Sequence, residues 1–321
     1  MTTSSLDIFF KLALVFLPSS TFVILLYLVP PRRVQNLPRS STEQILWRFV
    51  AVAIAMVLAP LPLYYLKESS SLSKHLFLFD LLGVSPRCNS VSSIVWPVLV
   101  TATLFLGPIV AFLVELVLES IEEVQKKESI NLIGKITSNL LNSLNRSING
   151  PAAIAVRSLI VAPFAEEWSF RACTIPIIIV CCGFSASAAV FFAGLSFALA
   201  HVHHYLDHVR NGMTPEHALR EILLQLSYTS VFGALEAVLF LQTGSYFGIV
   251  LPHIFCNFMG VPNMHWIQDS NILRKQLIAF FFLAGIISCI WLLLMGPLAS
   301  LGLERGLCIL TLFETGLIHK E

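Results

Sequence analysis

Residues 159–167 read LIVAPFAEE, an apolar run that ends on two adjacent carboxylates. Similar apolar runs recur along nearly the whole chain, and a helix that crosses a bilayer needs about 20 mainly apolar residues. The candidate spans are 8–29, 45–66, 93–118, 152–183, 185–203, 219–242, 244–262 and 276–302. The sequence therefore predicts an all-α, polytopic transmembrane helix bundle with about eight spans.

The composition supports a membrane protein and excludes a nucleic-acid-binding one. Hydrophobic residues make up 56% of the chain and charged residues 12%, and the mean hydropathy is +0.80. In soluble domains, hydrophobic residues average about 45–50% and charged residues about 25%. The formal net charge is only +1, and there is no run of Lys and Arg to bind a phosphate backbone. No long soluble stretch interrupts the apolar runs, so we expect residues 1–321 to form a single membrane domain.

Two features of the first half bear on topology. Arg32, Arg33 and Arg39 follow the first span, whereas no Lys or Arg precedes it, so the positive-inside rule places that loop in the cytosol and the N-terminus on the opposite side. Residues 119–148 combine most of the charge in the middle of the chain with apolar residues at helical spacing, which predicts an interfacial amphipathic helix. The seven cysteines lie mostly in apolar runs and are interpreted as reduced side chains.

The first polar cluster inside the predicted spans is Glu166, Glu167 and Arg171. Ionisable residues within a membrane are costly and are functional candidates by default. Glu167 and Arg171 have the i,i+4 spacing with the acid first, which favours an ion pair, while Glu166 projects about 100° away around the helix. This spacing predicts a structural role for Glu167 and a reactive role for Glu166 as a general base. A simple ion pair at the end of a helix remains the alternative for this cluster.

The second cluster follows Phe197 and begins at His201, the histidine that lies deepest in its span. The later histidines fall where the helix is expected to leave the bilayer, so they are interpreted as interfacial side chains. His201, His204 and His208 share one helix face, which leaves a metal site as a minor alternative.

The third cluster is His253 and Asn257, which lie four residues apart within an apolar run. Residues at this spacing are neighbours on a helix surface, so both side chains are expected to address one point. An imidazole N–H and an amide N–H in a water-poor pocket are suitable donors for a developing oxyanion. Together, the three clusters supply a base, an imidazole partner and two oxyanion donors for amide hydrolysis.

At these residues the chain resembles the type II CAAX prenyl endopeptidases, the Ras-converting-enzyme family of intramembrane glutamate proteases, in their eukaryotic branch. The pattern Glu-Glu-x-x-x-Arg, Phe-x-x-x-His and His-x-x-x-Asn is met in the family's order, and the resemblance covers about residues 150–262, the expected catalytic core. The residues that carry it are Glu166, Glu167, Arg171, Phe197, His201, His253 and Asn257.

The resemblance implies a protease that removes the last three residues of a farnesylated or geranylgeranylated CAAX protein, such as a Ras-like small GTPase, by cutting after the lipidated cysteine. It implies a multi-pass protein of the endoplasmic reticulum membrane with an active site open to the cytosol. Glu166 with His201 would activate a water, His253 with Asn257 would hold the oxyanion, and Glu167, Arg171 and Phe197 would support them. No cofactor and no metal ion are expected.

Other mechanisms and another class of protein stay open at this stage. Cys256 lies one turn from His253, which allows a thiol protease, and residues 183–186 have the Gly-x-Ser-x pattern of rhomboid serine proteases. The His-Glu-x-x-His pattern of zinc proteases is absent from the sequence. The alternative class is a transporter or channel in which Glu166, His201 and His253 form an intramembrane proton relay.

Overall fold

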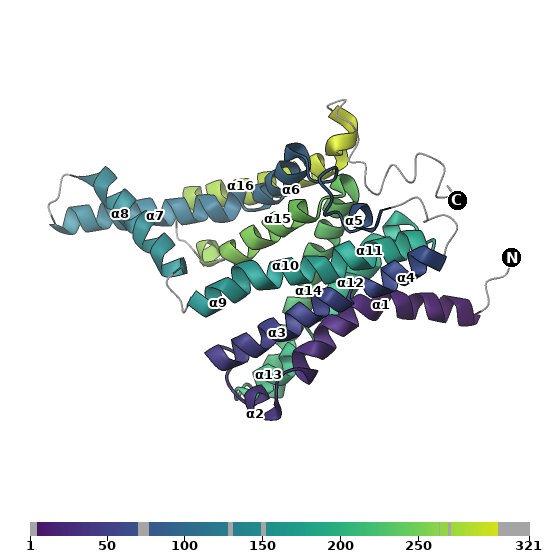
Figure 1. Cartoon of the computed structure of the whole chain (residues 1–321). Helices are drawn as coiled ribbons and strands as arrows, with labels where there is room; N and C mark the ends of the chain where they lie inside the picture. The colour runs from purple at the N-terminus through teal and green to yellow at the C-terminus, as the bar shows by residue number, and fades with distance from the viewer. Residues whose placement is uncertain are drawn as a thin grey trace.

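The structure is a computed structural model that describes residues 5–69, 77–127, 131–148, 152–262, 264–268 and 271–300. These residues form helices and turns and include no β-strand, which confirms the predicted all-α class. The helices of the first half, most of them running along the length of the bundle (Figure 1), are α1 (Ser5–Leu28), α2 (Arg32–Gln35), α3 (Thr42–Leu58), α4 (Leu61–Ser69), α5 (Leu78–Leu81), α6 (Val91–Leu104), α7 (Leu106–Lys127) and α8 (Leu132–Ile148).

The second half contains a long helical run that is interrupted by π-helical turns at three places. It consists of α9 (Ala152–Val156), η1 (Arg157–Val161), α10 (Ala162–Glu167), η2 (Trp168–Cys173), α11 (Thr174–Pro176) and η3 (Ile177–Cys181), where η1, η2 and η3 are π-helical. After it come α12 (Ala186–Leu199), α13 (His204–Arg210), α14 (Pro215–Thr243), α15 (Tyr246–Met259), η4 (His265–Gln268) and α16 (Ile272–Ser300). Single π-turns inside helices occur often at functional sites, and two of these flank the adjacent glutamates.

The described residues contain several helices that can cross a membrane. Five segments are long and apolar enough, and a sixth arises if α6 and α7, which are bent by 60° at their junction, form one span. The sequence predicted about eight spans because it also counted 152–183 and 244–262. The first of these regions is divided by π-turns, and α15 has 14 residues, which rise only about 21 Å.

Glycine allows the helices behind the site to approach closely. A Cβ atom on Gly233 of α14 would lie 2.9 Å from the Cα atom of Gly194 of α12, so larger residues at this crossing would push the two helices apart. The next helix begins immediately after a tight turn, because Gly244 ends α14 with a φ of 63° and the Ser245 hydroxyl caps α15. These contacts fix α12, α14 and α15 around one centre.

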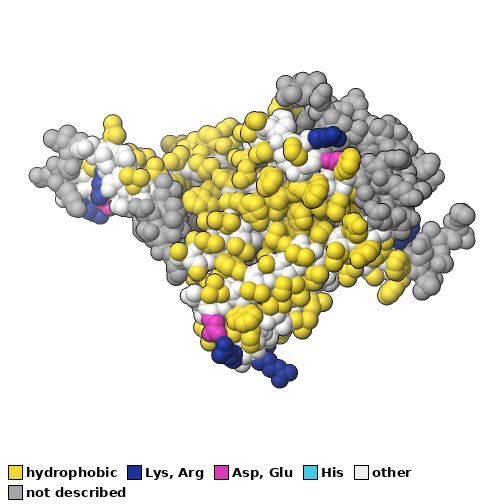
Figure 2. All heavy atoms as spheres, viewed as in Figure 1, with side chains coloured by type: hydrophobic (Ala, Val, Ile, Leu, Met, Phe, Trp, Pro, Cys, Tyr) yellow, Lys and Arg dark blue, Asp and Glu magenta, His cyan; other side chains and the backbone are white. Residues whose placement is uncertain are grey.

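The surface has the pattern expected for a protein in a bilayer. Hydrophobic side chains dominate the face in Figure 2, and the charged side chains visible there lie toward its edges. The helices that project from this bundle include α8, which packs on α7 through an ion pair between Lys135 and Glu123. One expectation was wrong: Cys88 is disulfide-bonded, whereas the free cysteines of the described residues are Cys173, Cys181, Cys182, Cys256 and Cys289.

Candidate active site

A single cavity brings together the four residues predicted to be catalytic. Its volume is about 1000 Å³, and its lining includes Glu166, His201, His253 and Asn257. Most of the rest of the lining is apolar and comes from α1, α3, α6, η1 and α14, as with Phe22, Val52, Leu104, Val161 and Val231. Residues that lie up to 91 positions apart in the sequence (166 to 257) therefore line one cavity.

The two adjacent glutamates lie in different environments. Glu167 is completely buried, and its Oε1 atom accepts hydrogen bonds from Arg171 Nη1 at 2.9 Å and from His253 Nδ1 at 2.6 Å. The Glu166 side chain remains 21% exposed and lines the cavity. The ion pair expected from the spacing of Glu167 and Arg171 is therefore present, and Glu166 is the carboxylate that solvent reaches.

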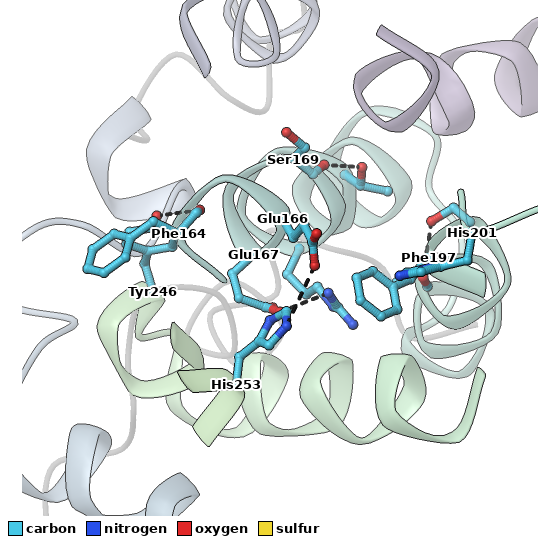
Figure 3. A network of polar contacts seen from close by, with 12 residues as sticks. Phe164, Glu166, Glu167, Ser169, Phe197, His201, Tyr246 and His253 are labelled. Carbon is cyan, nitrogen blue, oxygen red and sulfur yellow. Dashed lines mark hydrogen bonds and ion pairs between the residues drawn. The ribbon is translucent and has the colours of Figure 1, made fainter. Parts of the chain in front are cut away.

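His253 links the two glutamates (Figure 3). Because Glu167 Oε1 accepts from Nδ1, that ring nitrogen carries a hydrogen, and Nε2 is on the side of the ring that faces Glu166. Nε2 lies 3.6 Å from Glu166 Oε2, too far for a direct hydrogen bond but close enough for both atoms to contact one water or substrate atom. Glu167 thus orients the imidazole toward Glu166.

His201 is oriented by the backbone just beyond the end of α12. Its Nδ1 atom lies 2.7 Å from the carbonyl oxygen of Phe197. A carbonyl only accepts, so Nδ1 carries the hydrogen, and the neutral ring keeps an unprotonated Nε2 that can accept a hydrogen bond from a water. No direct contact joins His201 to Glu166 among the described side chains, although both line the cavity.

Asn257 is bound to the helical run that carries the glutamates. Its Nδ2 atom donates to the carbonyl oxygen of Ser158 at 2.9 Å. In the π register of η1 the Ala162 N–H bonds to the carbonyl five residues earlier, and the next N–H would come from Pro163, which has none. The carbonyl oxygen of Ser158 therefore receives no N–H from its own helix, and the Asn257 side chain donates to this oxygen instead. One Nδ2 hydrogen of Asn257 is therefore bound to Ser158, while Asn257 and His253 both line the cavity.

Aromatic rings close the back of the site. The Arg171 guanidinium lies 4.3 Å from the centre of the Phe197 ring, and this ring also contacts the rings of His201 and His253 edge-on. Arg171 and Phe197 are both buried. A desolvated cation over an aromatic face is stabilised by about 2 kcal/mol, so Phe197 supports both Arg171 and the two imidazoles.

The sequence interpretation missed Glu236, a completely buried residue of α14. It lies within electrostatic range of Glu167 and Arg171. Neither of its carboxyl oxygens has a hydrogen-bond partner in the part of the chain that the structure describes, and the same is true of Nε and Nη2 of Arg171. The sequence contained a sign of this residue, because Glu236 is an isolated carboxylate within the apolar stretch 231–241. An ionisable residue within a membrane span is a functional candidate.

The structure also bears on the other mechanisms. The Ser185 hydroxyl accepts from the Ala188 N–H and caps α12, and Ser185 does not line the cavity. His204 Nδ1 bonds to Gln225, and no group of three or more metal-binding side chains converges within the described ranges. Cys256 lines the cavity, so the thiol mechanism is left to be tested by a variant.

Comparison with known proteins places this site in a family. Residues 148–259 match the family model described as type II CAAX prenyl endopeptidase Rce1-like. CAAX prenyl protease 2 of Arabidopsis thaliana is 31% identical over 85% of this chain and 84% of its own length. The protein of the same name from Homo sapiens is 30% identical over 87% of this chain and 79% of its own length. A probable CAAX prenyl protease 2 of Schizosaccharomyces pombe is 40% identical over 35% of this chain and 42% of its own length.

No solved structure matches the chain. The family model covers the glutamate, histidine and asparagine positions described above, and the two longer matches extend through the preceding helices. The chain therefore belongs to the type II CAAX prenyl endopeptidase family and is a multi-pass membrane protease.

Proposed function

We propose that this protease removes the C-terminal tripeptide of prenylated CAAX proteins by hydrolysing the peptide bond after the lipidated cysteine. The observation that carries this proposal is the placement of Glu166 and His253 Nε2 3.6 Å apart at the wall of a largely apolar cavity. At this separation, a water held by Glu166 can attack an amide carbonyl whose oxygen faces His253 Nε2, while the apolar walls suit an isoprenoid chain.

The proposed reaction uses Glu166 as the base. Glu166 and His201 Nε2 each accept a hydrogen bond from one water. Glu166 removes a proton from this water as the water oxygen attacks the carbonyl carbon of the prenylated cysteine. The carbonyl electron pair moves onto oxygen. When the tetrahedral intermediate collapses, the C–N bond breaks, and the proton held by Glu166 passes to the amine of the departing tripeptide.

The oxyanion of that intermediate needs donors. Asn257 uses only one of its two Nδ2 hydrogens on Ser158, so the second is available to the oxyanion. His253 donates from Nε2 when its ring carries both hydrogens, with Glu167 bound at Nδ1. Fixed donors of this kind stabilise a developing oxyanion because they need no reorganisation during the reaction.

Substrates and location follow from the same chemistry. The names of the relatives support prenylated CAAX proteins as substrates, and we include farnesylated or geranylgeranylated Ras-like GTPases among them. A prenyl chain partitions into the bilayer and brings its peptide end to the interface. We place the protein in the endoplasmic reticulum membrane with the cavity open to the cytosol, the side assigned to Arg32, Arg33 and Arg39 by the positive-inside rule.

The test is to incubate the purified protein with a prenylated CAAX peptide and its unprenylated counterpart, and to measure the released tripeptide by mass spectrometry. We expect release from the prenylated peptide and little from the other. A Cys256→Ala variant should retain its rate within about twofold, since the proposed reaction makes no use of the thiol. Equal cleavage of both peptides would remove lipid recognition from the proposal, and an inactive Cys256→Ala protein that still folds would favour a thiol mechanism.

A further inference from the structure

Three arginines line the same cavity as the proposed catalytic residues. Arg39 follows α2, Arg48 belongs to α3 and Arg157 begins η1, so three separate segments contribute them. They are near enough to interact electrostatically, because Arg48 is influenced by both Arg39 and Arg157. All three are half-buried, and like charges held together at the edge of an apolar cavity repel one another unless an anion joins them.

The protein supplies only part of the balancing charge. Arg39 forms an ion pair with Asp207 of α13, and Arg157 donates to the backbone carbonyl of Arg39. Within the part of the chain that the structure describes, Arg48 has no hydrogen-bond or ion-pair partner, and Asp207 is the carboxylate paired with this group. Three positive charges against the one negative charge of Asp207 leave this group of arginines with an excess of two positive charges.

The spacing between Arg157 and Glu166 is close to the length of the tripeptide that the proposed reaction releases. Arg157 and Glu166 lie on one helical run, nine residues apart, which corresponds to about 13 Å along the axis at 1.5 Å per residue. A fully extended tripeptide covers about 10–11 Å. If the scissile carbonyl lies at Glu166 and His253, the end of the three departing residues therefore falls within reach of an arginine side chain.

We propose that Arg48, with Arg39 and Arg157, binds the free α-carboxylate of the substrate's last residue. Guanidinium groups suit this anion because their planar N–H groups match the two oxygens of a carboxylate. Anchoring the carboxylate sets how many residues lie beyond the cut, since a chain longer or shorter than three residues would bring a different bond to Glu166. This inference rests on the proposed function, because it assigns a recognition site for the same substrate.

The test compares two prenylated peptides that differ only in their last group, a free carboxylate or a carboxamide. We expect the unmodified protein to cleave the carboxylate peptide about tenfold more efficiently in kcat/KM, mainly through KM, as for loss of a hydrogen bond to a charged group. Arg48→Gln should lower kcat/KM for the carboxylate peptide about tenfold and change that for the carboxamide peptide less than about twofold. Arg48→Lys should recover part of the preference.

Arg33→Gln is the matched control, because the Arg33 side chain is 80% exposed, pairs with Glu43 and does not line the cavity. It should leave both rates unchanged. The unmodified protein tests the inference without any variant, so an unfolded Arg48→Gln protein does not remove the test. Equal cleavage of the two peptides by the unmodified protein would overturn the carboxylate site while leaving the proposed function intact, whereas no cleavage of either would overturn both.

An anionic lipid headgroup is the competing occupant. The same assays are therefore repeated in vesicles of phosphatidylcholine alone and of phosphatidylcholine with phosphatidylserine. The inference predicts the same carboxylate preference in both. If Arg48→Gln slows the two peptides equally, and does so only when phosphatidylserine is present, the arginines bind lipid and the inference is wrong.

Discussion

The buried charge cluster behind the site and the open wall of the cavity are built from neighbouring residues but differ in access to water. Glu167, Arg171 and Glu236 are completely buried, while Glu166 and Asn257 line the cavity and reach solvent. Glu167 and Glu166 are adjacent in sequence and contact opposite nitrogens of the same imidazole (Figure 3). One helix turn therefore contributes one carboxylate to each region.

The two regions hold a reactive group in place within a strongly apolar bundle by dividing the work between them. Charges in the buried cluster cannot exchange with water, so they hold their partners in one geometry, and breaking a buried pair is costly. Groups on the cavity wall keep lone pairs or hydrogens that the protein does not use, as with the second Nδ2 hydrogen of Asn257. Variants in the buried cluster should therefore change stability, and variants on the wall should change rate.

The largest expected effect on stability is that of Glu167→Gln. It leaves Arg171 buried beside a neutral group and weakens the hydrogen bond that orients His253, and loss of one partner from a buried pair costs about 3–5 kcal/mol. Thermal unfolding in detergent should show a large decrease in melting temperature. The double variant Glu167→Gln, Arg171→Met should recover part of the loss. A melting temperature equal to that of the unmodified protein would contradict the buried-cluster account.

On the cavity wall, Asn257→Ala should slow catalysis with a smaller effect on folding. Removing one oxyanion donor costs about 2.7–4 kcal/mol of transition-state stabilisation, or about 10²–10³-fold in kcat. Asn257→Asp is the sharper control, because an ionised aspartate is similar in size but donates no hydrogen. If Asn257→Ala lowered only the melting temperature and kept its kcat, the contact with Ser158 would be the whole role of this residue.

Glu167 and Asn257 also show which contacts the sequence can predict and which it cannot. The Glu167–Arg171 pair follows from i,i+4 spacing, and a shared cavity for Glu166, His201, His253 and Asn257 follows from the cost of polar groups in a membrane together with the resemblance. The bond from Asn257 to Ser158 does not follow, because it depends on a π-turn placed just before Pro163. The hydrogen bond between Glu167 and His253 depends on how α10 packs against α15. Local sequence patterns do not predict that packing.

The smallest expected effect among these variants is that of Glu236→Gln. Glu236 lies near both Glu167 and Arg171 but bonds to neither within the described residues, so a Gln of similar size breaks no hydrogen bond or ion pair there. We expect the stability to change by less than about 1 kcal/mol and kcat by only a few-fold. A loss as large as that of Glu167→Gln, measured by the same melting assay, would make Glu236 a full member of the bonded cluster.

The role of Glu166 as the general base is tested by the single-turnover rate of tripeptide release by Glu166→Gln, compared with that of the unmodified protein. Gln keeps the size of the side chain but cannot accept the water's proton, and loss of a general base lowers the rate about 10²–10⁴-fold. We expect that loss with an unchanged melting temperature, since the Glu166 side chain is partly exposed and is not part of the buried pair. A folded Glu166→Gln protein that releases tripeptide at the rate of the unmodified protein would contradict this role.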